Sequence, residues 1–129
     1  MKYNSLIPEL TVSDIEQTRR FYVDVLQFKV EYERVEDLFL FLSKEGNQMM
    51  FQQENDVWNT GEMEYPFGRG INFEMTVSDV NALYQRVLDA NIPPFKALQV
   101  HNYRSNEELI EQNEFLVQDP DGYLLRFTD

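Results

Sequence analysis

Hydrophobic residues follow the same order of patterns in both halves of the chain. In each half a short apolar segment, residues 5–12 or 71–77, leads into a run whose hydrophobic side chains recur every three or four residues. These residues are Ile15, Phe21, Tyr22, Val25 and Leu26 in the first half and Val80, Leu83, Tyr84, Val87 and Leu88 in the second. The pattern predicts a strand followed by one amphipathic helix in each half.

A short sequence repeat marks the start of both predicted helices. The segment TVSDI at 11–15 returns 65 residues later as TVSDV at 76–80. In the first copy Ser13 and Glu16 form an S-x-x-E capping box, which satisfies amide donors at a helix start. Ser78 is the expected cap of the second helix. The repeat predicts two copies of one structural module.

Apolar segments after each helix predict three further strands per half. They lie at 29–35, 38–43 and 48–52, and at 95–100, 114–118 and 123–128. The turns KEGN and DPDG before the last strands are suited to tight reversals. Aligning residues 39–51 with residues 115–127 changes the offset from 65 to 76. We therefore expect an insertion in the second half, as an exposed polar loop around 99–112.

Each half thus has the order β-α-β-β-β, which predicts an α+β fold of tandem βαβββ modules forming a curled mixed sheet around a cleft. A chain of 129 residues fits one domain. We place module one at about 1–53, a linker at 54–70 and module two at 71–129.

Composition limits the chemistry that this fold can carry. The chain has no cysteine, which excludes disulfides, thiolate zinc sites and cysteine nucleophiles. Its formal net charge of -12 disfavours nucleic acid and favours a cationic partner, although acidity also promotes solubility. No apolar run approaches the ~18 residues of a membrane helix, and no signal-peptide pattern begins the chain. We expect a cytoplasmic protein without a membrane partner.

The paired modules resemble the glyoxalase, bleomycin resistance and extradiol dioxygenase superfamily, also called the vicinal oxygen chelate proteins. The likeness rests on the two TVSD turns, the helix containing Phe21 and Tyr22, and the DPDG turn. The segments IPELTVSDIEQTRRFYVDVLQF and NEFLVQDPDGYLLRF are most similar to the bleomycin-resistance branch.

The resemblance also implies where metal-dependent members place their His and Glu ligands. Here those positions hold Ile7, Met50, Asn72 and Arg126. These side chains do not form the nitrogen and carboxylate set that Zn, Mn, Fe or Ni sites need. The single histidine, His101, falls in the inserted region and is expected at the surface. We expect no metal, no cofactor and no metal-dependent glyoxalase or dioxygenase activity.

Strand alternation assigns polar residues to the cleft. Glu9 and Ile7 share one face of the first strand, and Asn72 and Glu74 share the equivalent face of its repeat. The two glutamates should face each other across the groove. There they could attract a cation, share a proton, or be neutralised by Arg126. Aromatic residues in the linker either pack beneath the core or line a ligand pocket.

By this resemblance, the leading hypothesis is a non-catalytic homodimer that sequesters a cationic aromatic compound in a groove between subunits. One alternative is a metal-independent lyase or isomerase with Glu9 or Glu74 as general base. Another is a partner-binding scaffold with no small ligand. We assign no catalytic residue. The ligand-binding candidates are Glu9, Phe39, Phe41, Met50, Gln52, Trp58, Tyr65, Phe67, Asn72, Glu74, Tyr103 and Arg126.

Overall fold

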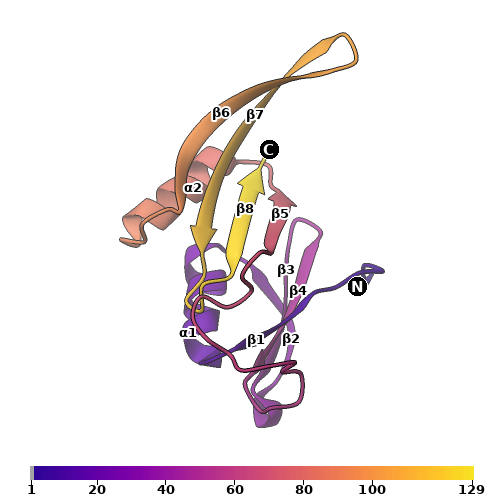
Figure 1. Cartoon of the computed structure of the whole chain (residues 1–129), viewed down its shortest axis with the longest axis vertical. Coiled ribbons are helices and arrows are strands. Elements are labelled where there is room, and N and C mark those ends of the chain that lie inside the picture. The colour runs from indigo at the N-terminus through magenta and orange to yellow at the C-terminus, as the bar shows by residue number, and fades with distance from the viewer. Residues whose placement is uncertain (1) are drawn as a thin grey trace.

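The structure is a computed structural model, and it describes residues 2–129. Two βαβββ modules follow one another along the chain (Figure 1). The elements are β1 (Glu9–Val12), α1 (Ile15–Arg19), the π-helical segment η1 (Arg20–Val25), β2 (Lys29–Arg34), the 3-10 helix η2 (Val35–Asp37), β3 (Phe39–Lys44), β4 (Asn47–Gln53), β5 (Asn72–Thr76), α2 (Val80–Asp89), β6 (Lys96–Ser105), β7 (Glu108–Gln118) and β8 (Leu124–Thr128).

Each module builds one mixed four-stranded sheet. The strand orders are β1-β4-β3-β2 and β5-β8-β7-β6. In both sheets the first strand runs parallel to the last, and the other pairs are antiparallel. The predicted α+β fold and module order are therefore confirmed. The first strand is shorter than expected, because β1 begins at Glu9 and leaves Ile7 outside it.

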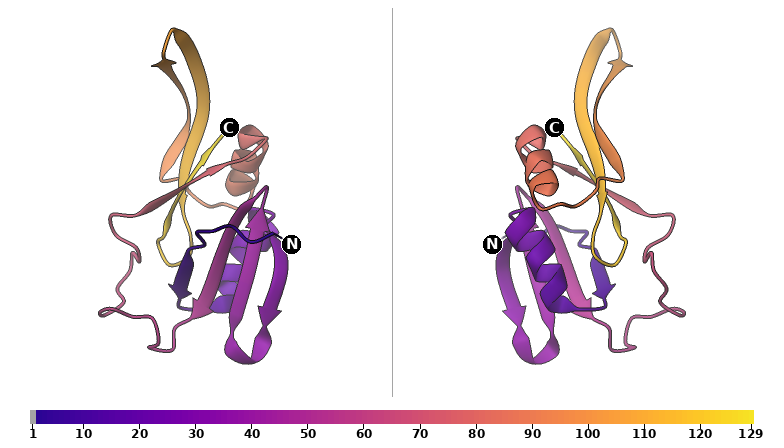
Figure 2. Two further views of the ribbon diagram at one scale, coloured as in Figure 1. Left: turned by 90° about the vertical axis from the view of Figure 1, so that its right-hand side faces the viewer. Right: turned by 90° about the vertical axis from the view of Figure 1, so that its left-hand side faces the viewer.

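A single hydrophobic core contains residues from both modules. The Tyr22 ring of η1 lies 4.5 Å from the Phe51 ring of β4, measured between centroids. In module two Phe115 stacks on Phe127 at 5.4 Å. In Figure 2, α2 lies directly above α1 in both views. The two helices thus pack on their own sheets and share one apolar interior.

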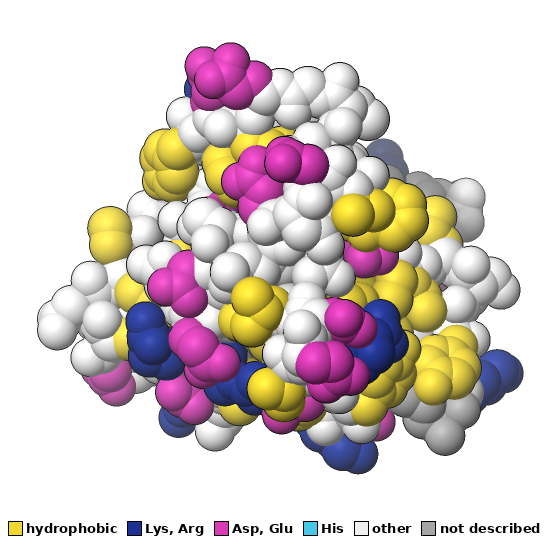
Figure 3. Space-filling view, turned by 90° about the horizontal axis from the view of Figure 1, so that it is seen from below, with side chains coloured by type: hydrophobic (Ala, Val, Ile, Leu, Met, Phe, Trp, Pro, Cys, Tyr) yellow, Lys and Arg dark blue, Asp and Glu magenta, His cyan; other side chains and the backbone are white. Residues whose placement is uncertain are grey.

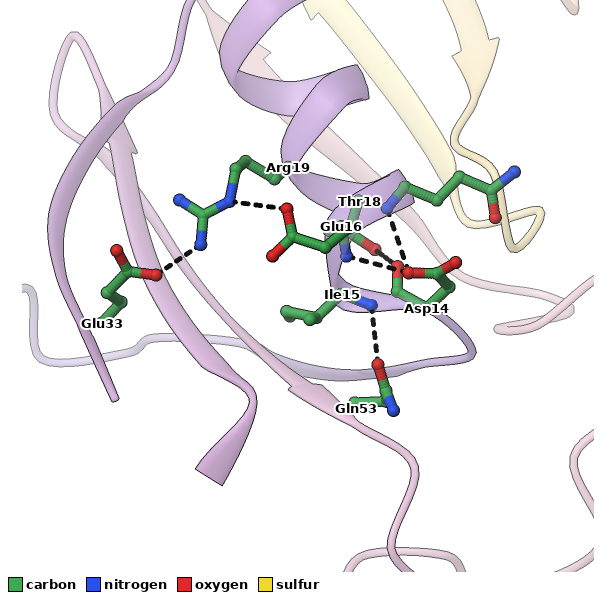
Figure 4. Close-up of polar contacts among 8 residues, drawn as sticks. Asp14, Ile15, Glu16, Thr18, Arg19, Glu33 and Gln53 are labelled. Carbon is green, nitrogen blue, oxygen red and sulfur yellow. Dashed lines mark hydrogen bonds and ion pairs between the residues drawn. The ribbon is translucent and has the colours of Figure 1, made fainter. Parts of the chain in front are cut away.

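Aspartates, not serines, cap the two helices. Asp14 accepts hydrogen bonds from the Glu16 and Gln17 amides at 3.0 and 3.3 Å, as Figure 4 shows for Glu16. Asp79 accepts one from the Ala82 amide at 3.0 Å. The prediction of Ser13 and Ser78 as caps was wrong by one residue in each repeat. Aspartate suits the position equally well and adds negative charge at the positive end of the helix dipole.

The first serine instead takes part in a contact between the modules. The Ser13 amide donates to both carboxylate oxygens of Asp121, in the turn before β8, at 3.2 Å. The Tyr123 hydroxyl of the same turn donates to the Thr11 carbonyl oxygen at 2.7 Å. We call this set of contacts the first junction.

A second junction repeats the first with the modules exchanged. The Ser78 amide donates to Glu45 in the turn before β4 at 2.9 Å. The Asn47 side-chain amide donates to the Thr76 carbonyl oxygen at 3.1 Å. Each module therefore supplies a turn that binds the strand-to-helix corner of the other module.

The expected polar loop around 99–112 is a β-hairpin. Strand β6 continues to Ser105 and β7 begins at Glu108, so pairing runs from Gln99 and Glu114 out to Ser105 and Glu108. This hairpin projects beyond the rest of the molecule (Figures 1 and 2). Its outer part is exposed on both faces. Without a buried face there is no alternation of polar and apolar residues to reveal a strand.

Figure 3 shows one face of the molecule with side chains coloured by type. On the face seen in Figure 3, acidic side chains lie among basic ones and separate hydrophobic groups. Among residues 2–129 no helix combines the length and the apolar character that crossing a bilayer requires.

Candidate functional site

The candidate site lies on the sheet faces that point away from the helices, here called the inward faces. In β3, Leu40 and Leu42 belong to the core, so alternation places Phe39 and Phe41 on the inward face. In β8, Leu125 and Phe127 belong to the core, so Arg126 lies on the inward face.

Aromatic rings fill the inward face of module one. Tyr32 stacks on Phe41 with 5.2 Å between ring centroids and an interplanar angle of 2°. Tyr3 contacts Phe41 edge-on, with 5.6 Å between the ring centroids. The Arg34 guanidinium lies 4.0 Å from the centre of the Phe39 ring. Phe39 and Phe41 are only 3% and 1% exposed, so side chains of the protein itself occupy this face.

Two buried glutamines complete this closed surface. The Gln52 side-chain amide donates to the Asp37 carbonyl oxygen at 2.6 Å. Gln48 donates to the Lys2 carbonyl oxygen at 2.7 Å and accepts from the Asn4 amide at 2.8 Å. These bonds hold η2 and the N-terminal segment against the sheet.

Module two has an open cavity on its inward face. The cavity has a volume of about 410 Å³. Its polar lining comes from Asn72, Lys96, Gln99, His101, Glu114 and Arg126.

The volume of this module two cavity, about 410 Å³, falls within the range of small-molecule sites, which is roughly 300–1,000 Å³. Four ionisable side chains lie in a row across the inward face, one from each strand of the sheet. An Arg126 Nη2 atom donates to Glu74 at 2.8 Å. Arg126 Nε lies 3.6 Å from one Glu114 oxygen, and His101 Nε2 lies 3.8 Å from the other. The row His101, Glu114, Arg126 and Glu74 therefore alternates basic and acidic groups.

Glu114 is the most enclosed member of this row, with its side chain only 13% exposed. Its contacts with Arg126 and His101 are longer than hydrogen bonds. The Arg126 Nε atom is itself buried and has no hydrogen-bond acceptor among the described residues. The cavity therefore offers both an acceptor and a donor to a bound molecule.

The residues of this cavity do not fit a metal ion. Within residues 2–129 no group of three or more His, Cys, Asp and Glu side chains could hold one. The Arg126 guanidinium occupies the centre of the charged row, where its positive charge opposes a cation bound to both glutamates. The arrangement is suited to binding a polar organic molecule.

The predicted site residues fall into separate groups. Phe39, Phe41, Met50 and Gln52 lie on the strands of module one, while Asn72, Glu74 and Arg126 lie together on module two. Glu74 is paired with Arg126, which is one of the arrangements the sequence left open. Glu9 is exposed on β1. No ion pair of Glu9 is found in the part of the chain that the structure describes.

The other aromatic candidates lie outside both inward-face groups or at their edge. Phe67 belongs to the core and meets Tyr123 edge-on, at 5.9 Å between centroids. Of the two roles that the sequence left open for the linker rings, Phe67 therefore has the first, packing beneath the core. Trp58 and Tyr65 are exposed on the linker. Tyr103 is exposed on the projecting hairpin.

Sequence reasoning missed Glu114 as a site residue and assigned His101 only to the surface. His101 is half-exposed and also lines the cavity. Glu114 was placed in a predicted strand at 114–118, but no residue of that strand was assigned to the cleft. Phe41 pairs with Met50 and Leu116 with Arg126, so the offset is 75 for the third strand of each module and 76 for the fourth. With that correction Glu114 is the counterpart of Phe39.

Comparison with known proteins agrees with this architecture. A family model described as the Glyoxalase/Bleomycin resistance protein/Dioxygenase superfamily matches residues 5–127. The chain belongs to the glyoxalase/bleomycin resistance protein/dioxygenase superfamily. This confirms the resemblance at the level of the superfamily, and the bleomycin-resistance branch stays a prediction.

Solved structures of the superfamily include one from Vibrio splendidus 12B01 that is 38% identical over 93% of this chain and 92% of that chain, with a TM-score of 0.43. A glyoxalase/bleomycin resistance protein/dioxygenase from Alicyclobacillus acidocaldarius is 24% identical, with coverages of 97% and 89% and a TM-score of 0.66. TioX from Micromonospora sp. ML1 is 19% identical, with coverages of 98% and 98% and a TM-score of 0.74. The last two show likeness of fold alone. The search of curated proteins found no match.

Proposed function

We propose that this superfamily member is a non-catalytic small-molecule binding protein, and that its ligand is a cationic aromatic compound held in the module two cavity. The enclosed carboxylate of Glu114 is the observation that carries the proposal. Its oxygens accept no hydrogen bond from residues 2–129, and its two ionic neighbours lie 3.6 and 3.8 Å away. A ligand N–H group could supply the missing donor, and a charged one would form the stronger bond.

Residues along the hairpin support the aromatic part of the ligand. Gln99, His101 and Tyr103 alternate along β6, so they share the face that continues from the cavity. The Tyr103 ring is exposed and could stack on a planar ligand. The cavity floor would then bind the cationic group while the hairpin contacts the rings.

A homodimer is the second part of the proposal. The hairpin is exposed on both faces and carries three exposed apolar side chains, Val100, Tyr103 and Leu109. A two-stranded ribbon gains little stability by itself, so a covering surface would favour its ordered form. Twofold pairing is the commonest assembly of soluble proteins and would let each chain cover the open side of the other cavity.

A binding titration with matched variants tests the ligand site. The wild type is titrated calorimetrically with a bleomycin-type glycopeptide at low and high salt, beside Glu114→Gln and Glu9→Gln. We expect Glu114→Gln to weaken binding about tenfold, because it removes a charge-assisted hydrogen bond. Glu9→Gln makes the same chemical change on β1, outside the cavity, and should leave affinity unchanged. Equal effects of the two variants, or affinity that salt does not alter, would contradict the proposal.

Light scattering measures the mass of the protein in solution and tests the dimer separately. We expect twice the chain mass for the wild type, and the single-chain mass for Leu109→Glu, which would place a carboxylate among the exposed apolar side chains of the hairpin. A wild-type monomer that still binds the ligand would remove the dimer from the proposal and leave the cavity as the site.

A further inference from the structure

A second cavity lies beside the helices, away from the inward faces of the sheets. It measures about 490 Å³ and shares no lining residue with the module two cavity. Its lining residues come from α1 and η1, the linker, the residues after α2, and the end of β7 with the turn that follows it. We call it the outer cleft and describe it by Arg20, Phe21, Tyr65, Ile92 and Asp119.

The walls of the outer cleft are largely apolar and well supported. Phe21 is buried and meets the Tyr22 ring edge-on at 5.1 Å. Tyr65 packs closely on the turn before β8, because a Cβ atom at Gly122 would lie only 3.1 Å from its ring. Arg69 also donates to the Tyr65 carbonyl oxygen at 2.9 Å. An aromatic ligand would therefore meet ordered rings on two sides.

The positive charge that the outer cleft offers to a ligand comes from Arg20. Its neighbour Arg19 pairs with Glu16 and Glu33 (Figure 4). Arg20 is exposed, and no ion pair of its guanidinium is found within residues 2–129. A planar guanidinium with unused donors is well matched to a carboxylate.

Asp119, by contrast, is only 3% exposed and accepts three hydrogen bonds. It accepts from the Tyr22 hydroxyl at 2.9 Å, from the Asp121 amide at 2.9 Å and from the Tyr123 amide at 3.0 Å. This burial and the three protein donors leave little of the carboxylate accessible to a ligand cation.

We propose that the outer cleft binds a small aromatic carboxylate. Its ring would lie between Phe21, Tyr65 and Ile92, and its carboxylate would pair with Arg20. The ligand charge is opposite to that proposed for the module two cavity, so the two sites can be tested independently.

Asp119 gives this binding a pH dependence. Burial raises its pKa to about 7, although the hydrogen bond from Tyr22 acts in the opposite direction. The groups that face it are Tyr22 from η1, Asp121 and Tyr123 from its own turn, and Arg20 across the cleft. Asp119 is mostly neutral at pH 6 and mostly charged at pH 8. An anion in the outer cleft should therefore bind more weakly at pH 8.

The test is a titration of the whole protein with phenylacetate, followed through backbone amide shifts by NMR. Phenethylamine and benzyl alcohol serve as cationic and neutral probes of similar shape. We expect saturable shifts around Arg20, Ile92 and Gln118 with phenylacetate, and weaker binding of both other probes. Shifts confined to the module two cavity, or equal binding of the amine, would overturn the proposal.

Two pairs of variants locate the site. Arg20→Gln should weaken phenylacetate binding about threefold to tenfold, as expected for one exposed ionic contact. Arg104→Gln removes the same charge from the exposed hairpin and should have no effect. Ala90→Trp, directly after α2, should block the cleft, whereas Ala82→Trp, exposed on α2 and outside the cleft, should not. Equal losses within both pairs would overturn the proposal, and the tryptophan pair decides the outcome should Arg20→Gln fail to fold.

Discussion

The two inward faces have the same strand order and register but very different side chains. Phe39 and Phe41 in module one correspond to Glu114 and Leu116 in module two. The aromatic pair is covered by Tyr32 and its neighbours, and that face becomes part of the packed interior. The polar face of module two stays open. On the same arrangement of strands, the side chains at a few positions therefore decide whether a sheet face is packed like a core or stays open to a ligand.

Removing a ring from the closed face should have the largest effect. Phe41→Ala is expected to lower the free energy of unfolding by about 3–5 kcal/mol, because it leaves a cavity in a packed aromatic group. Leu116→Ala, at the equivalent position, should cost less because Leu116 is half-buried and borders the open cavity. Urea unfolding of both variants measures the difference, and equal losses would contradict the contrast between the faces.

The turns of the two modules should also differ in their response to pH. Asp119 in module two has a pKa of about 7 when folded, against an ordinary value of 3.8. The folded state thus holds this proton more tightly, so stability from this group is greatest at low pH and is lost as the pH rises to about 7. The upper limit of the loss is about 4 kcal/mol, from roughly 1.4 kcal/mol per pH unit.

Comparing unfolding at pH 5 and pH 8 measures the part of this loss that falls between those values, at most about 3 kcal/mol. Asp119→Asn should reduce the fall in stability between the two values. The strand pairing makes Lys44 the module one counterpart of Asp119, so Lys44→Gln is the matched control and should leave the fall unchanged. If the pH dependence of stability in Asp119→Asn were unchanged, the Asp119 carboxyl would have the same pKa in the folded and the unfolded protein.

Altering the charge balance of the open face should have a smaller effect, of opposite sign to Glu114→Gln. Arg126→Gln leaves Glu74 and Glu114 without their shared cation. A cationic aromatic ligand should then bind more tightly by about 1 kcal/mol at low salt, and high salt should reduce the gain. Calorimetry at two salt concentrations measures this effect. Weaker binding by Arg126→Gln would mean that the guanidinium itself contacts the ligand.

The smallest expected effect concerns the rim of the closed face. Arg34 lies over Phe39 at 4.0 Å and is partly exposed. Arg34→Gln should lower stability by about 0.5–1 kcal/mol through loss of a cation–π contact. Thermal unfolding beside Arg104→Gln provides the measurement. If Arg34→Gln lowered the thermal stability no more than Arg104→Gln, the contact between the Arg34 guanidinium and the Phe39 ring would not stabilise the fold.

Local sequence patterns predicted most of the fold. The repeated TVSD segment and the helical spacing after it placed both modules, because each helix has one buried stripe. The outer part of β6 and β7 lacked such a pattern because both of its faces are exposed. Ser13 and Ser78 were misassigned because serine and aspartate are both good caps and stand side by side in the motif.

The site was less predictable because it depends on register between strands. The turn from Gln118 to Leu124 is one residue longer than the turn from Ser43 to Gln48. That single residue moves every side chain of the aligned strand to the other face. With the offset of 76, Glu114 corresponds to Leu38, which precedes β3, and not to Phe39 on the inward face. Its ionic contacts with Arg126 and His101 come from other strands and leave no local signal.

The paired junctions also bear on how the two halves depend on each other. Ser13 needs Asp121 from module two, and Ser78 needs Glu45 from module one. If the linker were cut, each fragment would lack hydrogen-bonding partners that only the other fragment supplies, and it would expose its share of the common core. The two pieces would then be expected to reassemble as a complementing pair, because contacts across the junctions, more than the covalent linker, unite the molecule.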